Sequence, residues 1–220
     1  MNGLSWKPWF GGMLLGCVMS LLSPTVPTVS AEGVGSFGGI EPKTWVLGAR
    51  AGFSVPTQTL SNTFNVPISS DIGPLVNFQA MYSFNNWLLA GMMIEWERHG
   101  VDFDFGFNAV DLGHQDTVSV LPTVEIRPVK LGQFVPYANM SFGVNVNSFG
   151  ESVPAVISPS NTFAWRIGWG ADFMLNNHIA LNAEWAYKRN DGHAHIDRNR
   201  VNDWNASSFG FLFGVKAFFN

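Results

Sequence analysis

The 220-residue chain carries few charges: 13% of its residues are Asp, Glu, Lys or Arg, against about 25% in ordinary soluble domains. Its net charge of −4 gives no support to nucleic-acid binding, and after residue 31 no apolar run is long enough for a membrane helix. With 9 Trp, 19 Phe and 23 Gly, the composition is typical of a protein that crosses a membrane with β-strands, whose apolar residues occupy alternate positions.

Residues 1–31 are predicted to form a secretory signal peptide. Lys7 precedes an apolar stretch, and Val29-Ser30-Ala31 supplies a cleavage site of the small-x-small type. The alternative is a lipoprotein signal at Leu14-Leu15-Gly16-Cys17, but the apolar run continues beyond Cys17, where it would serve no anchoring purpose. Because Cys17 is the only cysteine, we expect no disulfide, no thiolate metal site and no cofactor in the processed chain.

A Gly-rich periplasmic lead is expected at residues 32–43, and from residue 44 onward apolar and polar residues alternate with the period of two that is typical of β-strands. Eight segments show this pattern, each about long enough for a tilted strand to cross a bilayer. They cover residues 45–55, 76–84, 88–97, 118–127, 137–146, 162–175, 179–187 and 208–219. The sequence therefore predicts an all-β fold over residues 44–220, an eight-stranded antiparallel up-and-down transmembrane β-barrel.

The connections between these segments alternate between long and short. Residues 56–73, 148–161 and 190–205 are polar and are expected to be loops, whereas Asn85-Asn86 and Asn176-Asn177 mark tight turns. This alternation is typical of barrels with long extracellular loops and short periplasmic turns.

The hairpin at residues 162–187 indicates which face meets lipid. One row of its first strand contains Phe163, Trp165 and Trp169, whereas the other row combines Gly and Ala with isolated charges. The interior of an eight-stranded barrel is only just wide enough for ordinary side chains, so we interpret the aromatic row as lipid-facing. A soluble barrel with the apolar row inside is the alternative, and it would require a dense polar coat that this chain lacks.

The predicted inward rows carry five cations and five anions. They are Arg50, Arg127, Arg166, Lys188 and Lys216, and Glu95, Glu97, Glu125, Asp172 and Glu184. A lone charge in a narrow interior is costly, and pairing offsets much of that cost. The balance predicts a lumen plugged by salt bridges, and a narrow or gated conduit is the alternative.

The alternation changes phase near His99-Gly100. Beyond this point Val101, Phe103, Phe105 and Phe107 occupy the positions that had been inward. Either a bulge at Gly100 restores the outward direction, or these residues form an apolar ridge at the barrel mouth.

Two patterns in the last third of the chain could carry chemistry. His193, His195 and Asp197 share one face of an extended segment, but a mobile loop without supporting hydrogen bonds seldom preorganises a metal, so no metal site is expected. Ser208, His195 and Glu184 could be combined into a Ser/His/acid triad, yet no motif places them together. We therefore expect no enzyme activity.

Several patterns resemble the small eight-stranded outer-membrane proteins of the OmpA, OmpW and opacity-protein type, a porin family. The hairpin reads Gly168-x-Gly170-x-Asp172-x-x-Leu175-x-Asn177-x-x-x-Leu181-x-x-Glu184-x-x-Tyr187, and Pro136-Tyr137 with Gly143 is similar to the strand-five pattern of that group. Gly214, Ala217 and Phe219 resemble the signal read by the outer-membrane insertion machinery, although Asn220 follows the terminal aromatic.

The resemblance implies a monomer of the bacterial outer membrane, in contact with lipid and lipopolysaccharide. We predict a structural or surface-interaction role. An OmpW-like narrow channel for small hydrophobic molecules is the alternative, based on the apolar ridge, and a lipid A-modifying enzyme is less favoured.

Overall fold

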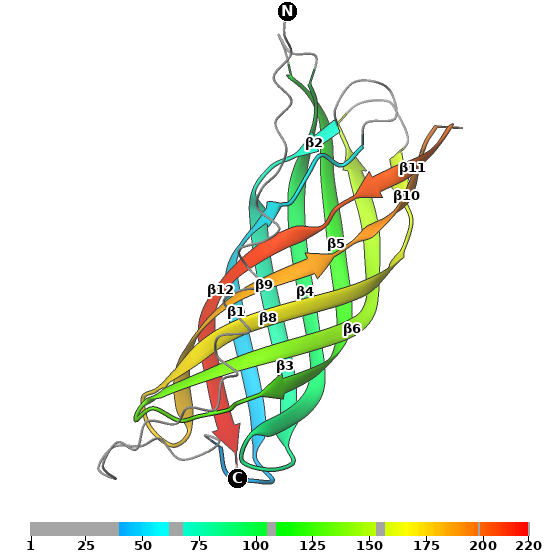
Figure 1. The fold of residues 1–220 in the computed structure, drawn as a ribbon. Coiled ribbons are helices and arrows are strands. Elements are labelled where there is room, and N and C mark those ends of the chain that lie inside the picture. The colour runs from blue at the N-terminus through cyan, green and yellow to red at the C-terminus, as the bar shows by residue number, and fades with distance from the viewer. Residues whose placement is uncertain (1–39, 62–67, 105–108, 153–156, 198, 220) are drawn as a thin grey trace, which may run out of the picture. The chain divides into compact units, whose positions relative to one another are not determined.

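The computed structural model describes residues 40–61, 68–104, 109–152, 157–197 and 199–219 (Figure 1). All of them belong to one unit of the chain, residues 35–220. The predicted signal peptide with Cys17 lies outside the described residues, as do Phe105 and Phe107 of the predicted ridge. In the part of the chain that the structure describes, no helix is long and apolar enough to span a membrane.

Eight long strands form a closed antiparallel barrel, which confirms the predicted fold. They are β1 (Trp45–Pro56), β3 (Gly73–Ser83), β4 (Leu88–Asp104), β5 (Ala109–Ile126), β6 (Phe134–Glu151), β8 (Thr162–Met174), β9 (Ile179–Arg189) and β12 (Ser208–Phe219). Each pairs with its neighbours in the chain, and β1 also pairs with β12 from Trp45 opposite Phe219 to Pro56 opposite Ser208. Closure leaves no strand edge exposed to lipid, where an unpaired backbone group would be costly.

The two ends of the barrel differ in their connections. The turn end carries the short connections after β3, β5 and β8, together with Trp45 and Phe219. The loop end carries the long connections and four short strands: β2 (Ile68–Ser70), β7 (Ile157–Pro159), β10 (Asp191–Ile196) and β11 (Asn199–Asn205) (Figure 1).

The prediction of a plain polar loop at residues 190–205 is wrong. This segment forms the hairpin of β10 and β11, and β7 pairs with β10 to complete a three-stranded sheet. The polar residues that suggested a loop occupy its solvent side, whereas Ala194, Val201 and Trp204 are buried. A register shift between Gly192 and Ala194 interrupts the alternation that would have marked the strands.

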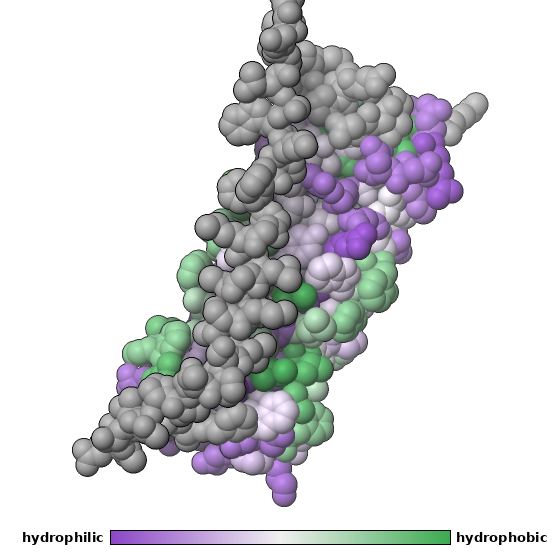
Figure 2. Space-filling view, viewed as in Figure 1, coloured by the Kyte–Doolittle hydropathy of each residue, from purple (hydrophilic) through white to green (hydrophobic). Residues whose placement is uncertain are grey.

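The two rows of the barrel wall face as predicted. Phe163 is 65% exposed on the outer wall, whereas the neighbouring Arg166 is 1% exposed inside. On the visible face, apolar residues lie along the middle of the wall and hydrophilic residues gather toward its ends (Figure 2). Aromatic rings pack against one another on β9 and its neighbours, for example Trp185 against Trp169 at 4.6 Å between ring centroids.

Pro122 lies inside β5 on the outer row, although proline has no backbone N–H to donate to a neighbouring strand. The β5–β6 register runs to Val120 opposite Val144 and resumes at Thr123 opposite Ser141. The proline therefore interrupts the ladder locally and does not end the strand.

Three apolar clusters divide the interior along the barrel. Along β4 the inward row contains Leu89 of the turn-end cluster, Met93 of a small central cluster, then Glu95 and Glu97, and Val101 of the loop-end cluster. At the turn end, Ile40 and Phe218 pack beside Leu89. Charged residues are thus enclosed between apolar layers.

Candidate functional site

All ten charged residues predicted for the lumen lie inside the barrel, and none is more than 4% exposed. They form two groups. The loop-side cluster contains Arg50, Glu95, Glu97, Arg166, Glu184 and Lys188, and the turn-side cluster contains Glu125, Arg127, Asp172 and Lys216. Each cluster has as many cations as anions, so each is neutral.

Glu184 on β9 is the most connected anion of the loop-side cluster. Its Oε2 pairs with Arg50 Nη1 on β1, and its Oε1 lies 2.5 Å from Arg166 Nη2 on β8. The phenol of Tyr137 donates a hydrogen bond to Oε2 at 2.8 Å, and Asn139 Nδ2 donates another at 2.7 Å. One carboxylate therefore pairs with two arginines, one on β1 and one on β8, which offsets part of the cost of burying all three groups.

The same cluster continues toward the loop end with alternating charge. Glu95 lies between Arg166 (Nε–Oε2, 3.1 Å) and Lys188 (Nζ–Oε1, 3.1 Å), and Lys188 Nζ also lies 2.8 Å from Glu97 Oε1. The space that these four side chains line, together with Leu75, Ala186, Ser208 and Gly210, is too small to admit a water molecule. At this level the side chains fill the interior.

The turn-side cluster forms a closed square. Arg127 Nη2 lies 2.6 Å from both Glu125 Oε1 and Asp172 Oδ2, and Lys216 Nζ lies 3.2 Å from Glu125 Oε2 and 3.4 Å from Asp172 Oδ1. Each charge therefore has two partners of opposite sign, which offsets the cost of complete burial.

Tyr137 and Asn182 connect the two clusters. Asn182 Nδ2 donates to Asp172 Oδ1 at 2.6 Å and to Tyr137 Oη at 2.9 Å, while the phenol donates to Glu184. Lys216 Nζ lies 3.8 Å from the centre of the Tyr137 ring, a cation–π contact. Sequence reasoning assigned neither residue a role inside the barrel, because a neutral side chain does not show in a charge count.

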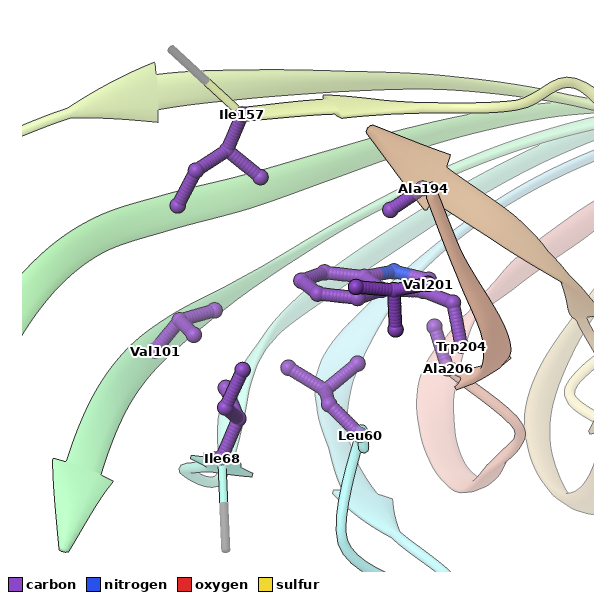
Figure 3. Packing of buried hydrophobic residues seen from close by; sticks show 8 residues of the cluster. All are labelled: Leu60, Ile68, Val101, Ile157, Ala194, Val201, Trp204 and Ala206. Atoms are coloured by element: carbon purple, nitrogen blue, oxygen red, sulfur yellow. The ribbon is translucent and has the colours of Figure 1, made fainter. Parts of the chain in front are cut away.

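An apolar cap closes the loop end of the interior. Its buried residues are Leu60, Ile68, Val101, Ile157, Ala194, Val201, Trp204 and Ala206, which converge from β2, β4, β7, β10, β11 and adjoining segments (Figure 3). The indole N–H of Trp204 donates a hydrogen bond to Gln115 Oε1 at 3.0 Å, which joins the cap to the polar layer beneath it. Sequence reasoning missed this cap because most of its members lie in segments interpreted as loops.

The structure distinguishes the two interpretations of the phase change in β4. The β4–β5 register continues through Gly100 opposite His114, and it shifts only between Val101 and Asp102. No bulge at Gly100 restores the outward direction, so Val101 is fully buried in the cap and Phe103 packs against it. Whether these residues act as a functional ridge remains a prediction.

His99 is an inward residue whose role the sequence did not reveal. Its Nδ1 lies 2.7 Å from the carbonyl oxygen of Asp71, and its Nε2 lies 3.0 Å from Ser54 Oγ and 3.6 Å from Glu97 Oε2. A carbonyl only accepts hydrogen bonds, so the Nδ1 carries a proton and donates it. The ring connects the segment after β2 to the loop-side cluster.

The suggested Ser/His/acid triad does not form. Ser208 Oγ donates to Glu97 Oε2 at 3.0 Å, and Glu184 is held by two arginines. His195 is exposed on β10.

The three residues compared with an assembly signal lie on β12, at the closure of the barrel. Gly214 faces inward beside Arg50, and a Cβ on it would lie 2.0 Å from the carbonyl oxygen of Ala49, so only glycine fits there. Ala217 and Phe219 face outward. Recognition of these residues by insertion machinery remains a prediction.

Solved structures with a similar fold are small barrels. They include OprG from Pseudomonas aeruginosa, with 13% identity, a TM-score of 0.71 and coverage of 84% of this chain and 100% of that one. AlkL in DMPC bilayers has 12% identity, a TM-score of 0.57 and coverage of 90% and 97%. Neisserial surface protein A has 13% identity, a TM-score of 0.52 and coverage of 79% of this chain and 96% of that one. At these identities the likeness concerns the fold alone.

Among curated proteins none matches the sequence significantly. A family model described as the outer membrane protein beta-barrel domain matches residues 34–216, most of the chain. This match agrees with the closed barrel, its lipid-facing outer row and its enclosed charges. The chain therefore belongs to the outer membrane β-barrel family and is a protein of the bacterial outer membrane.

Proposed function

We propose that this barrel is closed and serves a structural or surface-interaction role, without an open aqueous pore. The supporting observation is the loop-side cluster, in which Glu95, Glu97, Arg166 and Lys188 leave no space for a water molecule. Passage of ions requires a continuous path through the lumen, lined by groups such as backbone carbonyls or rings of charged side chains of one sign. Here the charges are fully paired, and an apolar cap lies above them.

Planar-bilayer recording tests this proposal. The wild-type barrel is expected to show no stable conductance steps, whereas an R166A/E184A variant, which removes one cation and one anion, is expected to open a hydrated gap and conduct. Stable openings of the wild-type protein that match those of the variant would overturn the proposal.

A conduit for small hydrophobic molecules is the second candidate. It is favoured by the buried apolar side chains that converge at the loop end, including Val101, Ile157 and Trp204 (Figure 3). Uptake of a hydrophobic solute by cells that produce the protein would support it, provided that a V101E variant with an unchanged barrel abolishes the uptake. The absence of both uptake and conductance would eliminate it.

The proposed partners are lipopolysaccharide at the loop end and the insertion machinery at β12, with the barrel as a monomer. Exposed Arg98 and Arg189 lie just above Trp96 and Tyr187 on the outer wall, at the level where a headgroup layer begins.

We propose no catalytic role. Mass spectrometry of lipid A with and without the protein tests this, and an altered acylation pattern would contradict it.

A further inference from the structure

Two histidines lie side by side on β10, on the face opposite the apolar cap. His193 and His195 flank Ala194, whose side chain points into the cap (Figure 3), so alternation directs both imidazoles toward solvent. Their ring centroids lie 5.7 Å apart, with an angle of 80° between the ring planes. Within the part of the chain that the structure describes, no hydrogen bond occupies either ring.

The backbone that carries this pair is held on both sides. In the small sheet β10 is the central strand, with His195 opposite Arg200 of β11 and Ser158 of β7. Ser160 N–H donates to the His193 carbonyl at 2.8 Å, and the His193 N–H donates to Ser160 Oγ at 3.1 Å. A mobile loop was the reason to expect no metal here, and that reason does not apply to a paired strand.

We propose that His193 and His195 together form a site for a divalent first-row transition metal ion, with Cu²⁺ bound most tightly. With metal–nitrogen bonds of about 2.0–2.1 Å, two imidazoles that share one ion have ring centres roughly 4.5–6 Å apart. The observed 5.7 Å lies in this range. Imidazole nitrogen suits Cu²⁺, Ni²⁺ and Zn²⁺, and divalent affinity in such sites peaks at Cu²⁺.

The site has two protein ligands, and water completes the coordination. Asp197 does not continue the face of the two histidines, because it lies in the turn after β10 with a left-handed backbone (φ 53°). The described residues contain no group of three His, Cys, Asp or Glu residues arranged to hold a metal. Arg200, opposite His195, opposes a bound cation. The site is therefore open and exchangeable, unlike a closed structural metal site.

Titration of the purified barrel with Cu²⁺, without an affinity tag, tests the proposal. Calorimetry is expected to give one site, and electron paramagnetic resonance is expected to show nitrogen ligands in the equatorial plane. Because the second imidazole acts at high local concentration, H193Q and H195Q are each expected to weaken this site by about tenfold or more.

Two histidines elsewhere provide matched controls. His114 is exposed on β5 near Asp116, and His178 lies at the turn end. Because neither ring belongs to the pair, H114Q and H178Q are each expected to leave the affinity for Cu²⁺ within about twofold of wild type. Circular dichroism checks that all variants fold alike. Wild-type affinity in H193Q or in H195Q would overturn the proposal, as would an equal loss in H114Q.

Discussion

The middle of the barrel and its loop end are both closed, but by different means. In the middle, ten buried charges form two neutral clusters in which each side chain has specific partners. At the loop end, apolar side chains from short strands pack without that specificity. Loss of one partner from a buried charge network leaves an uncompensated charge, which is strongly destabilising. Loss of a side chain from an apolar cluster reduces stability in proportion to the apolar area that is no longer buried. The first region should therefore control the stability of the whole barrel, and the second should control only local opening.

The largest effect is expected for E184Q. This change leaves Arg50 and Arg166 without their shared carboxylate, and removal of one partner from a buried ion pair costs about 3–5 kcal/mol. Urea unfolding in lipid vesicles, followed by tryptophan fluorescence, measures the loss in the free energy of unfolding. A loss in the free energy of unfolding smaller than that expected for an exposed ion pair would contradict the difference drawn between the two regions.

Restored neutrality should recover part of this loss. In R50M/E184Q the loop-side cluster retains two cations and two anions, so we expect the double variant to be roughly 1–3 kcal/mol more stable than the sum of the single variants predicts. The complete cycle requires R50M alone. Additive losses would show that the balance of charge does not matter.

A smaller and local effect is expected for W204F. The variant keeps most of the apolar volume of the cap but leaves Gln115 Oε1 without its hydrogen bond, at a cost of about 1–3 kcal/mol. Hydrogen exchange of β10 and β11 should speed up while the unfolding midpoint of the barrel stays unchanged, because the cap opens independently. A midpoint that falls as far as in E184Q would contradict the separation of the two regions.

The smallest effect is expected for D191N, which makes the same carboxylate-to-amide change as E184Q. Asp191 pairs with Arg189 at 2.5 Å at the surface, where both side chains are partly exposed. Exposed pairs contribute less than about 1 kcal/mol, so the free energy of unfolding should barely change in the same urea experiment. A loss comparable to that of E184Q would show that burial is not the cause of the difference.

The direction of each side chain in the wall could be predicted from the sequence, because a period of two is a local property of a strand. Arg166 and Asp172 were placed inside for this reason. The pairing of charges could not be predicted. Arg50 and Glu184 are 134 residues apart, and the partner of each depends on the register and tilt of all eight strands.

The loop end was harder to predict for two physical reasons. The phase change at Gly100 hid the continuation of β4, which runs to Asp104, and the short strands β10 and β11 contain a register shift that breaks their pattern. Burial of Trp204 depends on segments that meet only in the folded barrel. Such contacts have no local signature in the sequence.

Arg50 lies on β1 and its partner Glu184 lies on β9, far apart in the sequence, and this has a consequence for assembly. As long as β1 and β12 have not joined, a growing sheet presents unbalanced ions to the hydrocarbon, which penalises every incomplete intermediate. Circularisation of the sheet is also the step that completes charge compensation. The paired charges therefore stabilise the closed barrel relative to its partly assembled forms, and they disfavour insertion one hairpin at a time.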